Sequence, residues 1–183
     1  MSETSPLLTA HRALLERWRG SMNLVGPGPV DFHFRDAEAA LDGLTAAGQW
    51  ADLGSGAGFP GIAFASRFPE VELLLVESRQ KRCVFLRAVL AEAGWGPQVS
   101  VSHGRVEGLA PGSLDGVMAR AFAPWPAVLA HARRLLRPEG MALLMHGAED
   151  EPEADDFLTV SRRSYAIDGR PRRVTLLQRR PGR

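Results

Sequence analysis

The sequence predicts an α/β fold: a seven-stranded, mostly parallel sheet that ends in an antiparallel hairpin. Through the middle of the chain, short apolar segments alternate with helix-length amphipathic ones, which is typical of parallel strands joined by right-handed crossover helices. Two further apolar segments flank a turn at 168–171 and predict the hairpin. We therefore expect a single domain over 1–183, with an N-terminal helical extension (1–47) and an α/β core (48–183).

Two helices are expected in the extension. The first begins at Ser5-Pro6, because serine caps helices and proline fits the first helical position, and apolar side chains then recur at helical spacing. The glycine- and proline-rich segment 25–29 interrupts this pattern. The second helix is expected at about 32–47, where Gly48 ends it.

The core is expected to alternate strands and helices before the hairpin. Each predicted strand is a short apolar segment, and each predicted helix has amphipathic spacing. Strands are predicted at 49–53, 71–77, 98–102, 113–119, 141–145, 163–167 and 172–178. Helices are predicted at 60–68, 80–94 and 126–136.

A glycine-rich loop, ADLGSGAGFPG, covers the end of the first predicted core strand and the turn into the next helix. Gly54, Gly56 and Gly58 permit unusual backbone angles and let a ligand approach the main chain, at the sheet edge where open α/β sheets bind ligands. The segment 56–61 matches G-x-G-x-x-G, which is a weak signal alone. Glu77 ends the next strand, where a carboxylate accepts hydrogen bonds from ribose hydroxyls. The loop therefore predicts a cofactor with an adenosine-type ribose.

NAD and S-adenosylmethionine both carry such a ribose, and three observations favour S-adenosylmethionine. Asp52 directly precedes the glycines, where a carboxylate is unsuited to a pyrophosphate but suits the sulfonium and ammonium of the methionine part, directly or through water. The chain leaves little room for a hydride-transfer domain, and the terminal hairpin fits the methyltransferase form of the fold. An NAD-dependent reductase is the least favoured alternative, and a thermal-shift comparison of S-adenosylhomocysteine with NADH would separate the two.

Composition excludes several classes of protein. The single cysteine, Cys83, excludes an internal disulfide framework, and no His, Cys or carboxylate group has metal-ligand spacing, so we expect no metal. A formal net charge of +1 argues against a globally basic nucleic-acid binder. The sequence has no apolar run long enough for a bilayer and no signal peptide, so we expect a cytoplasmic protein without a membrane partner.

Charged residues are unevenly distributed. Of the 22 Lys and Arg residues only Lys81 is a lysine, which suits a GC-rich genome and also bidentate phosphate recognition. The segment 147–156 is acidic, whereas 162–183 is rich in arginine. A solvated surface is the ordinary interpretation of these segments, and a basic strand edge that faces an RNA backbone is the alternative.

Four segments of the sequence resemble one family. DLGSGAGFPGI, ESRQKRCVFL, GRVEGL and MARAFAPW are similar to segments of the bacterial small-subunit rRNA guanine-N7 methyltransferases, long called glucose-inhibited division protein B. The resemblance runs in order from Trp18 to about Arg120 and weakens towards the end. It implies a Rossmann-like class I fold, S-adenosyl-L-methionine as cofactor, and 16S rRNA or a small ribosomal subunit particle as partner. We expect a monomer.

The resemblance also implies roles for individual residues. Gly54 and Phe59 line the cofactor site, and Glu77 matches the family's acid at the ribose. Val106 and Glu107 lie beside the adenine. Together with the loop analysis, the expected cofactor-binding residues are Asp52, Gly54, Gly56, Gly58, Phe59, Glu77, Val106, Glu107 and Arg120.

Methylation of guanine N7 needs no general base, because N7 has an available lone pair. Catalysis can then come from holding nucleophile, methyl carbon and sulfur in line. Arg120 is the expected catalytic residue, which orients the guanine, a phosphate or the cofactor carboxylate; a salt bridge to a carboxylate at the sheet edge is the alternative. Substrate contacts are expected from Arg19, His33, Arg35, Arg79, Lys81, Arg82, Arg105, His146 and the arginines after Arg162.

Departures from the family pattern fall on the substrate side. The stretch before His33 is short, Ala37 replaces a usual serine, and His146 precedes Gly147 where the family tends to have lysine. The cofactor motifs are intact. Two alternatives therefore stand beside methylation of 16S rRNA: a divergent relative that methylates another RNA or a small molecule, and a cofactor-binding domain without transfer activity.

Overall fold

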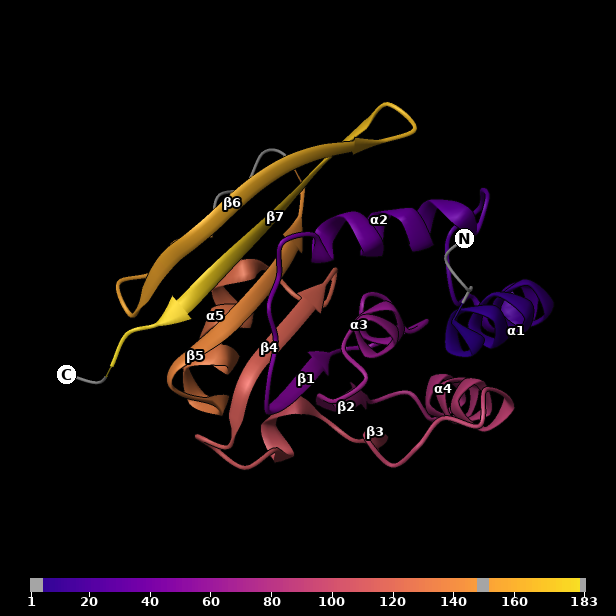
Figure 1. Cartoon of the computed structure of the whole chain (residues 1–183), viewed down its shortest axis with the longest axis horizontal. Coiled ribbons are helices and arrows are strands. Elements are labelled where there is room, and N and C mark those ends of the chain that lie inside the picture. Colours follow the sequence, from indigo (N-terminus) through magenta and orange to yellow (C-terminus); the bar gives the residue numbers. More distant parts are fainter. Residues whose placement is uncertain (1–4, 148–151, 182–183) are drawn as a thin grey trace.

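The computed structural model describes residues 5–147 and 152–181, which form one seven-stranded sheet with helices on both faces (Figure 1). The strands are β1 (Gln49–Leu53), β2 (Glu72–Glu77), β3 (Val99–His103), β4 (Leu114–Arg120), β5 (Leu136–His146), β6 (Phe157–Ile167) and β7 (Arg170–Arg179). The helices are α1 (Pro6–Met22), α2 (Asp31–Leu41), α3 (Gly61–Arg67), α4 (Gln80–Glu92) and α5 (Trp125–Leu135), with one 3-10 turn, η1 (Val106–Gly108).

The strands lie in the order β3-β2-β1-β4-β5-β7-β6. β1 to β5 are parallel, and β7 pairs antiparallel with both β5 and β6. This arrangement confirms the predicted mostly parallel sheet with its C-terminal hairpin. The strand order reverses between β1 and β4, so the glycine-rich loop after β1 lies at the switch point where open α/β sheets bind ligands.

Two apolar cores cover the two faces of the sheet. Trp50 of β1 faces the core that α1 to α4 build, whereas its neighbour Ala51 faces the core that α5 builds, because successive residues of a strand point to opposite faces. Gly116 of β4 makes room for Trp50, since a Cβ at this glycine would lie 2.2 Å from the indole ring. The buried faces thus hold β1 and β4 in register beneath the loop.

The two N-terminal helices belong to the first core. α1 packs against α3 and α4, and α2 packs against α3 and β6. Leu7 and Leu15 of α1, and Ala37 and Leu41 of α2, are fully buried. The extension therefore supports the sheet directly, and α2 reaches the C-terminal hairpin (Figure 1).

The predicted end of the second helix at residue 47 is wrong. α2 ends at Leu41, and Gly43 turns the chain with a φ of +70°. Arg163 of β6 donates to the carbonyl oxygens of Ala39 and Ala40 at 3.0 and 2.9 Å, so a side chain caps the last turn of α2. Residues 44–48 then run to β1 without helical structure.

Three strands are longer than predicted, and one of them is β7, which runs from Arg170 to Arg179 and so begins within the predicted turn at 168–171. β5 begins at Leu136, which pairs with Leu114 before a shift in register, so residues 136–140 extend the strand predicted at 141–145. β6 begins at Phe157, because the backbone pairs with β7 at the sheet edge even though Leu158 and Val160 are exposed. Among the described residues, no helix is long and apolar enough to span a membrane.

Candidate functional site

Three cavities form a row at the carboxyl ends of β1, β2 and β4. The Glu77 cavity, about 520 Å³, is lined among others by Glu77, Arg79, Arg105 and Val106. The loop cavity, about 240 Å³, is lined by residues 54–57 with Leu24, Val25, His33, Phe59, Arg82, Arg120 and Ala121. The hairpin cavity, about 260 Å³, is lined by Asp36, Arg120, Ala121, Met145, His146, Gly147, Tyr165, Arg172 and Arg173.

Shared residues join the three cavities. Gly54, Arg82 and Ala121 line both the Glu77 cavity and the loop cavity, and Arg120 and Ala121 line both the loop cavity and the hairpin cavity. A larger cavity of about 580 Å³ lies at the other end of the sheet, near Gln49 and the start of β2. We assign the site to the row because the glycine-rich loop and most of the sequence-predicted site residues lie there.

The glycine-rich loop exposes its main chain to the row of cavities. Gly54 has a φ of +72°, and a Cβ there would lie 2.4 Å from the ring of Phe122, so no larger residue fits. Ser55 fixes the turn, because its N–H donates to Val76 O at 2.9 Å and its hydroxyl donates to Asp52 O at 2.9 Å. At Gly56 a Cβ would lie in ordinary van der Waals contact with Arg82, at 3.6 Å, and this glycine lines the loop cavity.

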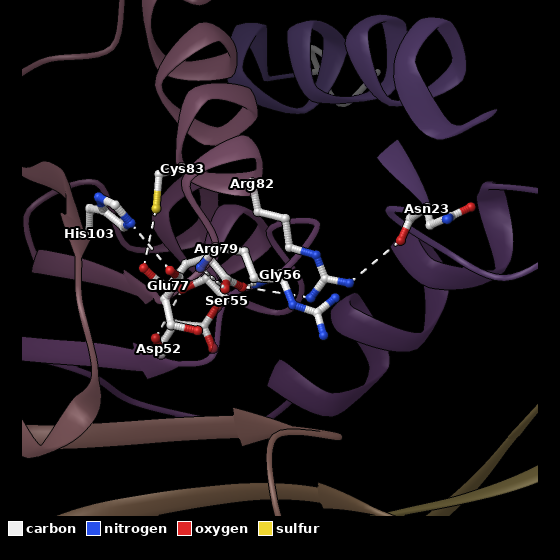
Figure 2. Close-up of polar contacts among 10 residues, drawn as sticks. Asn23, Asp52, Ser55, Gly56, Glu77, Arg79, Arg82, Cys83 and His103 are labelled. Carbon is white, nitrogen blue, oxygen red and sulfur yellow. Dashed lines mark hydrogen bonds and ion pairs between the residues drawn. The ribbon is translucent and has the colours of Figure 1, made fainter. Parts of the chain in front are cut away.

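Glu77 ties the loop to the start of α4. Its carboxylate accepts the N–H of Gly56 at 3.0 Å and the N–H of Arg79 at 2.8 Å, and Arg82 Nη1 lies 3.7 Å away (Figure 2). The side chain is 5% exposed. A carboxylate has about four acceptor positions, so two protein donors leave acceptor capacity for ligand hydroxyls at the cavity.

Asp52 lies beneath the loop and lines none of the three cavities. Its Oδ2 accepts the N–H of Gly61 at the start of α3 at 3.1 Å, and its Oδ1 is buried without a partner among the described residues. Burial raises the pKa of Asp52 to about 7. Asp52 therefore joins the loop to the start of α3, and its expected contact with the methionine part of the cofactor, directly or through water, stays a prediction.

A buried histidine of α1 also holds the loop. His11 Nε2 lies 2.6 Å from the carbonyl oxygen of Ala57, and its ring lies among those of Phe34, Phe59 and Phe85. The carbonyl accepts, so the proton of His11 sits on Nε2. Burial lowers the pKa of His11 to about 4, so the ring is neutral near pH 7.

Arg120 is bound by two side chains of α2. Its Nη2 lies 3.2 Å from Asp36 Oδ2 and 2.8 Å from His33 Nδ1. Asp36 is 1% exposed, and its Oδ1 accepts the hydroxyl of Tyr165 at 2.9 Å, with Arg172 Nε at 3.7 Å. Burial lowers the pKa of Arg120, and the Asp36 carboxylate opposes this shift. α2, β4 and the hairpin therefore meet in one buried polar network.

Comparisons with known proteins match this chain to one family. The family model described as rRNA small subunit methyltransferase G, GidB, matches residues 5–174. The chain belongs to this family. A sequence named Ribosomal RNA small subunit methyltransferase G from Paracoccus denitrificans is 35% identical over 158 residues, which cover 84% of this chain and 81% of that protein. A protein of the same name from Cereibacter sphaeroides is 39% identical over 155 residues, covering 80% and 74%.

The fold agrees with that membership. A solved structure from Klebsiella pneumoniae, provisionally described as an O-methyltransferase, superposes with a TM-score of 0.70 at 17% identity, over 98% of this chain and 92% of the other. At this identity the likeness supports the class I methyltransferase fold. The resemblance to small-subunit rRNA methyltransferases seen in the four sequence segments is confirmed by the family model and the curated relatives.

The row of cavities fits S-adenosylmethionine, the methyl donor of this enzyme class. Glu77 offers a carboxylate in the cavity that Val106 and Glu107 of η1 also line, which suits an adenosine. Gly54 and Gly56 leave bare main chain in the adjoining loop cavity, which suits the methionine part. Among the described residues, no group of three or more His, Cys, Asp or Glu side chains is arranged to hold a metal ion.

The structure brings together some predicted substrate residues and separates others. Arg79, Arg82 and Arg105 border the Glu77 cavity, His33 the loop cavity, and His146 the hairpin cavity. Arg19, Arg35 and Lys81 line none of the three cavities. Arg19 donates to Gly26 O at 3.3 Å, and Arg35 pairs with Asp168 at 2.6 Å, so Arg35 links α2 to the β6–β7 turn.

Several residues of the site were missing from the predicted site residues. Tyr165 was not predicted, and it meets Asp36 because the hairpin folds back over α2, a contact that no local sequence pattern indicates. Arg172 was predicted only as one of the arginines after Arg162, and its position near Asp36 was not. His131 of α5 and Phe122 border the Glu77 cavity from the opposite side. The spacing of His33 and Asp36, three residues apart on a helix, was a usable signal because such residues share a face.

The arginines of the C-terminal hairpin mostly have structural partners. Arg163 caps α2, Arg172 faces Asp36, and Arg179 donates to Leu136 O. Within the acidic segment 147–156, residues 148–151 lie outside the described part of the chain. Asp156 pairs with Arg133 of α5 at 3.1 Å. These contacts favour the solvated-surface interpretation of the charge distribution over a basic strand edge.

Proposed function

We propose that this chain transfers the methyl group of S-adenosylmethionine to N7 of a guanine in 16S rRNA. The observation that carries the proposal is the continuous row of cavities, in a chain that belongs to the rRNA small subunit methyltransferase G family. The Glu77 and loop cavities receive the cofactor. The hairpin cavity, which shares Arg120 and Ala121 with the loop cavity, receives the guanine.

The bound cofactor supplies an electrophilic methyl carbon on a sulfonium. The guanine N7 lone pair forms the new C–N bond while the C–S bond breaks, and no proton has to leave N7. The hairpin cavity suits a reaction in which no proton has to be removed, because the carboxylate of Asp36 is already bound to Arg120 and Tyr165. The protein's contribution is then to hold the reacting atoms in line and to exclude water.

Arg120 is proposed as a positioning residue at the junction of the two cavities. Its side chain is 17% exposed and bound to Asp36 and His33. These contacts hold α2 against β4 in addition to orienting a ligand. The salt bridge weighed as the alternative to a catalytic role is present, with Asp36 of α2 as the partner. Removing Arg120 would therefore leave Asp36 with fewer partners as well as opening the pocket.

Ribosomal RNA requires a phosphate-binding surface, and the exposed basic rim of the Glu77 cavity supplies one in this proposal. Arg79 and Arg105 are exposed, and Arg82 is partly buried between the two cofactor cavities. Because the net charge is only +1, we propose the small ribosomal subunit particle over free rRNA as the substrate. We also propose that 1–183 acts as one domain and as a monomer, in the cytoplasm.

The test uses methyl-labelled S-adenosylmethionine with small ribosomal subunits from a strain that lacks the activity. Free rRNA and total tRNA run in parallel. We expect label in the small-subunit particle, with less in free rRNA and none in tRNA. Label in tRNA alone would support the divergent relative, and no label in any RNA despite S-adenosylhomocysteine binding would support a cofactor-binding domain without transfer.

A further inference from the structure

The hydrogen-bonding state of His33 follows from its partner. Arg120 Nη2 lies 2.8 Å from His33 Nδ1, and a guanidinium has donors only. Nδ1 must therefore accept, which leaves the single proton of the neutral imidazole on Nε2. Burial and the Arg120 charge both lower the pKa of His33, to about 4, in keeping with a neutral ring. His33 is thus held as a one-proton donor with a defined face.

Buried contacts fix the direction of that donor. Arg120 is held by Asp36, and Asp36 by Tyr165 at 2.9 Å. The ring of His33 lies 5.6 Å from that of Phe59. Both rings line the loop cavity. Among the described residues none hydrogen-bonds His33 Nε2, so the donor is available to a ligand.

The position of His33 relates it to the acceptor. His33 shares the loop cavity with Arg120 and Ala121, the two residues that also line the hairpin cavity. On the proposed function, this junction is where the guanine meets the methyl donor. The edge of guanine that carries N7 also carries O6, which is an acceptor, whereas adenine presents an N6 amino donor at the same place.

We propose that His33 Nε2–H donates to O6 of the acceptor guanine and thereby selects guanine over adenine. A donor at O6 leaves the N7 lone pair free to attack, whereas a donor at N7 would compete with the reaction. The neutral state matters because a second proton on Nδ1 would break the bond to Arg120. This assignment rests on the proposed function and adds a specificity-determining residue to it.

Three variants of α2 separate this role from a structural one. His33→Phe keeps a ring and removes the donor. His33→Gln restores the pattern, because its amide oxygen can accept from Arg120 while its amide nitrogen donates into the cavity. Glu38→Gln is the matched control, since Glu38 is exposed on the same helix. Affinity for S-adenosylhomocysteine is measured by calorimetry for all three, independently of transfer.

The decisive experiment is a double-mutant cycle that combines the change at His33 with a change of the acceptor base. Small subunits are reconstituted with 16S rRNA that carries either guanine or 2-aminopurine, which lacks O6 but keeps N7, at the methylated nucleotide. For the unchanged protein, 2-aminopurine should lower kcat/KM roughly ten- to hundredfold, the cost of leaving a hydrogen-bonding group unpaired. For His33→Phe the same base change should matter less than about threefold, since the interaction is already absent.

Each outcome has a distinct meaning. Reduced transfer by His33→Phe, partial recovery by His33→Gln and cofactor affinity unchanged within about twofold support the assignment. Equal losses from the base change in the unchanged protein and in His33→Phe overturn it, as does a parallel loss of S-adenosylhomocysteine affinity, which would assign the donor to the cofactor. If the unchanged protein labels no guanine at all, the proposed function fails first and the O6 assignment falls with it.

Discussion

At the scale of single residues, the cofactor cavity depends on Gly54 and Glu77, and the loop beside it depends on a contact from His11. Gly54 and Glu77 lie at positions that the strand–loop–helix pattern defines, and both line the Glu77 cavity as expected. His11 of α1 contacts Ala57, which lies 46 residues away in the sequence. Contacts of that kind arise from tertiary packing, for which a single sequence holds no local signal.

Glu77 offers a direct test of the cofactor cavity. Glu77→Gln replaces one acceptor oxygen by a donor that must face a backbone N–H, of Gly56 or Arg79. We expect the affinity for S-adenosylhomocysteine to fall at least about tenfold, measured by calorimetry. Glu92→Gln is the control, because Glu92 is exposed at the end of α4 and lines none of the three cavities. Equal effects of the two changes would contradict the assignment of Glu77.

His11 makes the stability of the fold depend on pH. Its pKa is lowered from 6.5 to about 4, so between pH 4 and 6.5 the unfolded chain binds more protons than the folded one. The stability that His11 contributes is therefore present above pH 6.5 and is lost as the pH falls towards 4. Asp52, whose pKa is raised to about 7, has the opposite sign, because the stability it contributes is lost as the pH rises towards 7.

Comparison with His11→Phe isolates the histidine. The phenylalanine keeps an aromatic ring but cannot donate to Ala57, so it should be less stable at pH 7.5 by about 1–3 kcal/mol. The difference in unfolding free energy between the two proteins should narrow as the pH falls from 6.5 to 4.5, measured by urea denaturation. A difference independent of pH would show that His11 does not titrate as the buried geometry requires.

At the scale of elements, α2 connects the sheet to the site. The predicted start lies within one residue of the observed one, whereas the predicted end at residue 47 lies beyond Leu41, where the turn at Asp42-Gly43 ends the helix. Arg163 of β6 caps this end, although the sequence placed it only among the arginines after Arg162, as substrate contacts or a solvated surface. Helix ends that depend on distant side chains cannot be located from local pattern alone.

The buried contacts between α2 and the hairpin should contribute more to the free energy of unfolding than the exposed ion pair between the same elements. Tyr165→Phe removes the hydroxyl that donates to the buried Asp36, and we expect a loss of about 1–3 kcal/mol in unfolding free energy. Arg35→Ala breaks the exposed pair with Asp168, whose side chains are 49% and 48% exposed, and should cost less than about 1 kcal/mol. Equal losses would mean that Asp36 does not depend on its tyrosine partner.

At the scale of the whole molecule, the fold class and the family followed from the sequence, whereas the order of the cavities did not. Strand alternation and the terminal apolar pair were enough for the sheet, and four motifs were enough for the family. The row of cavities depends on how α2 and the hairpin approach Arg120, which no stretch of sequence encodes by itself. The predicted substrate residues are therefore scattered, and Arg19, Arg35 and Lys81 line none of the three cavities.

Binding to ribosomal particles should depend on salt if the basic rim of the Glu77 cavity contacts phosphates. We expect the apparent affinity to fall steadily between about 50 and 200 mM salt, with a shallower slope for Arg105→Ala, because Arg105 is exposed at that rim. Arg67→Ala is the control, since Arg67 pairs with Asp42 away from the three cavities. Affinity that is indifferent to salt would contradict a phosphate-binding surface here.

The position of the transferred methyl group tests the proposed function most directly. Small ribosomal subunits from a strain that lacks the activity would be incubated with the protein and labelled S-adenosylmethionine, and the 16S rRNA digested and analysed by mass spectrometry. We expect one labelled nucleotide, a 7-methylguanine, because methylation of N7 needs no general base. The carboxylate that lines the hairpin cavity, Asp36, is bound to Arg120 and Tyr165. Label on an exocyclic amine, on a ribose hydroxyl or on several nucleotides would contradict transfer to guanine N7.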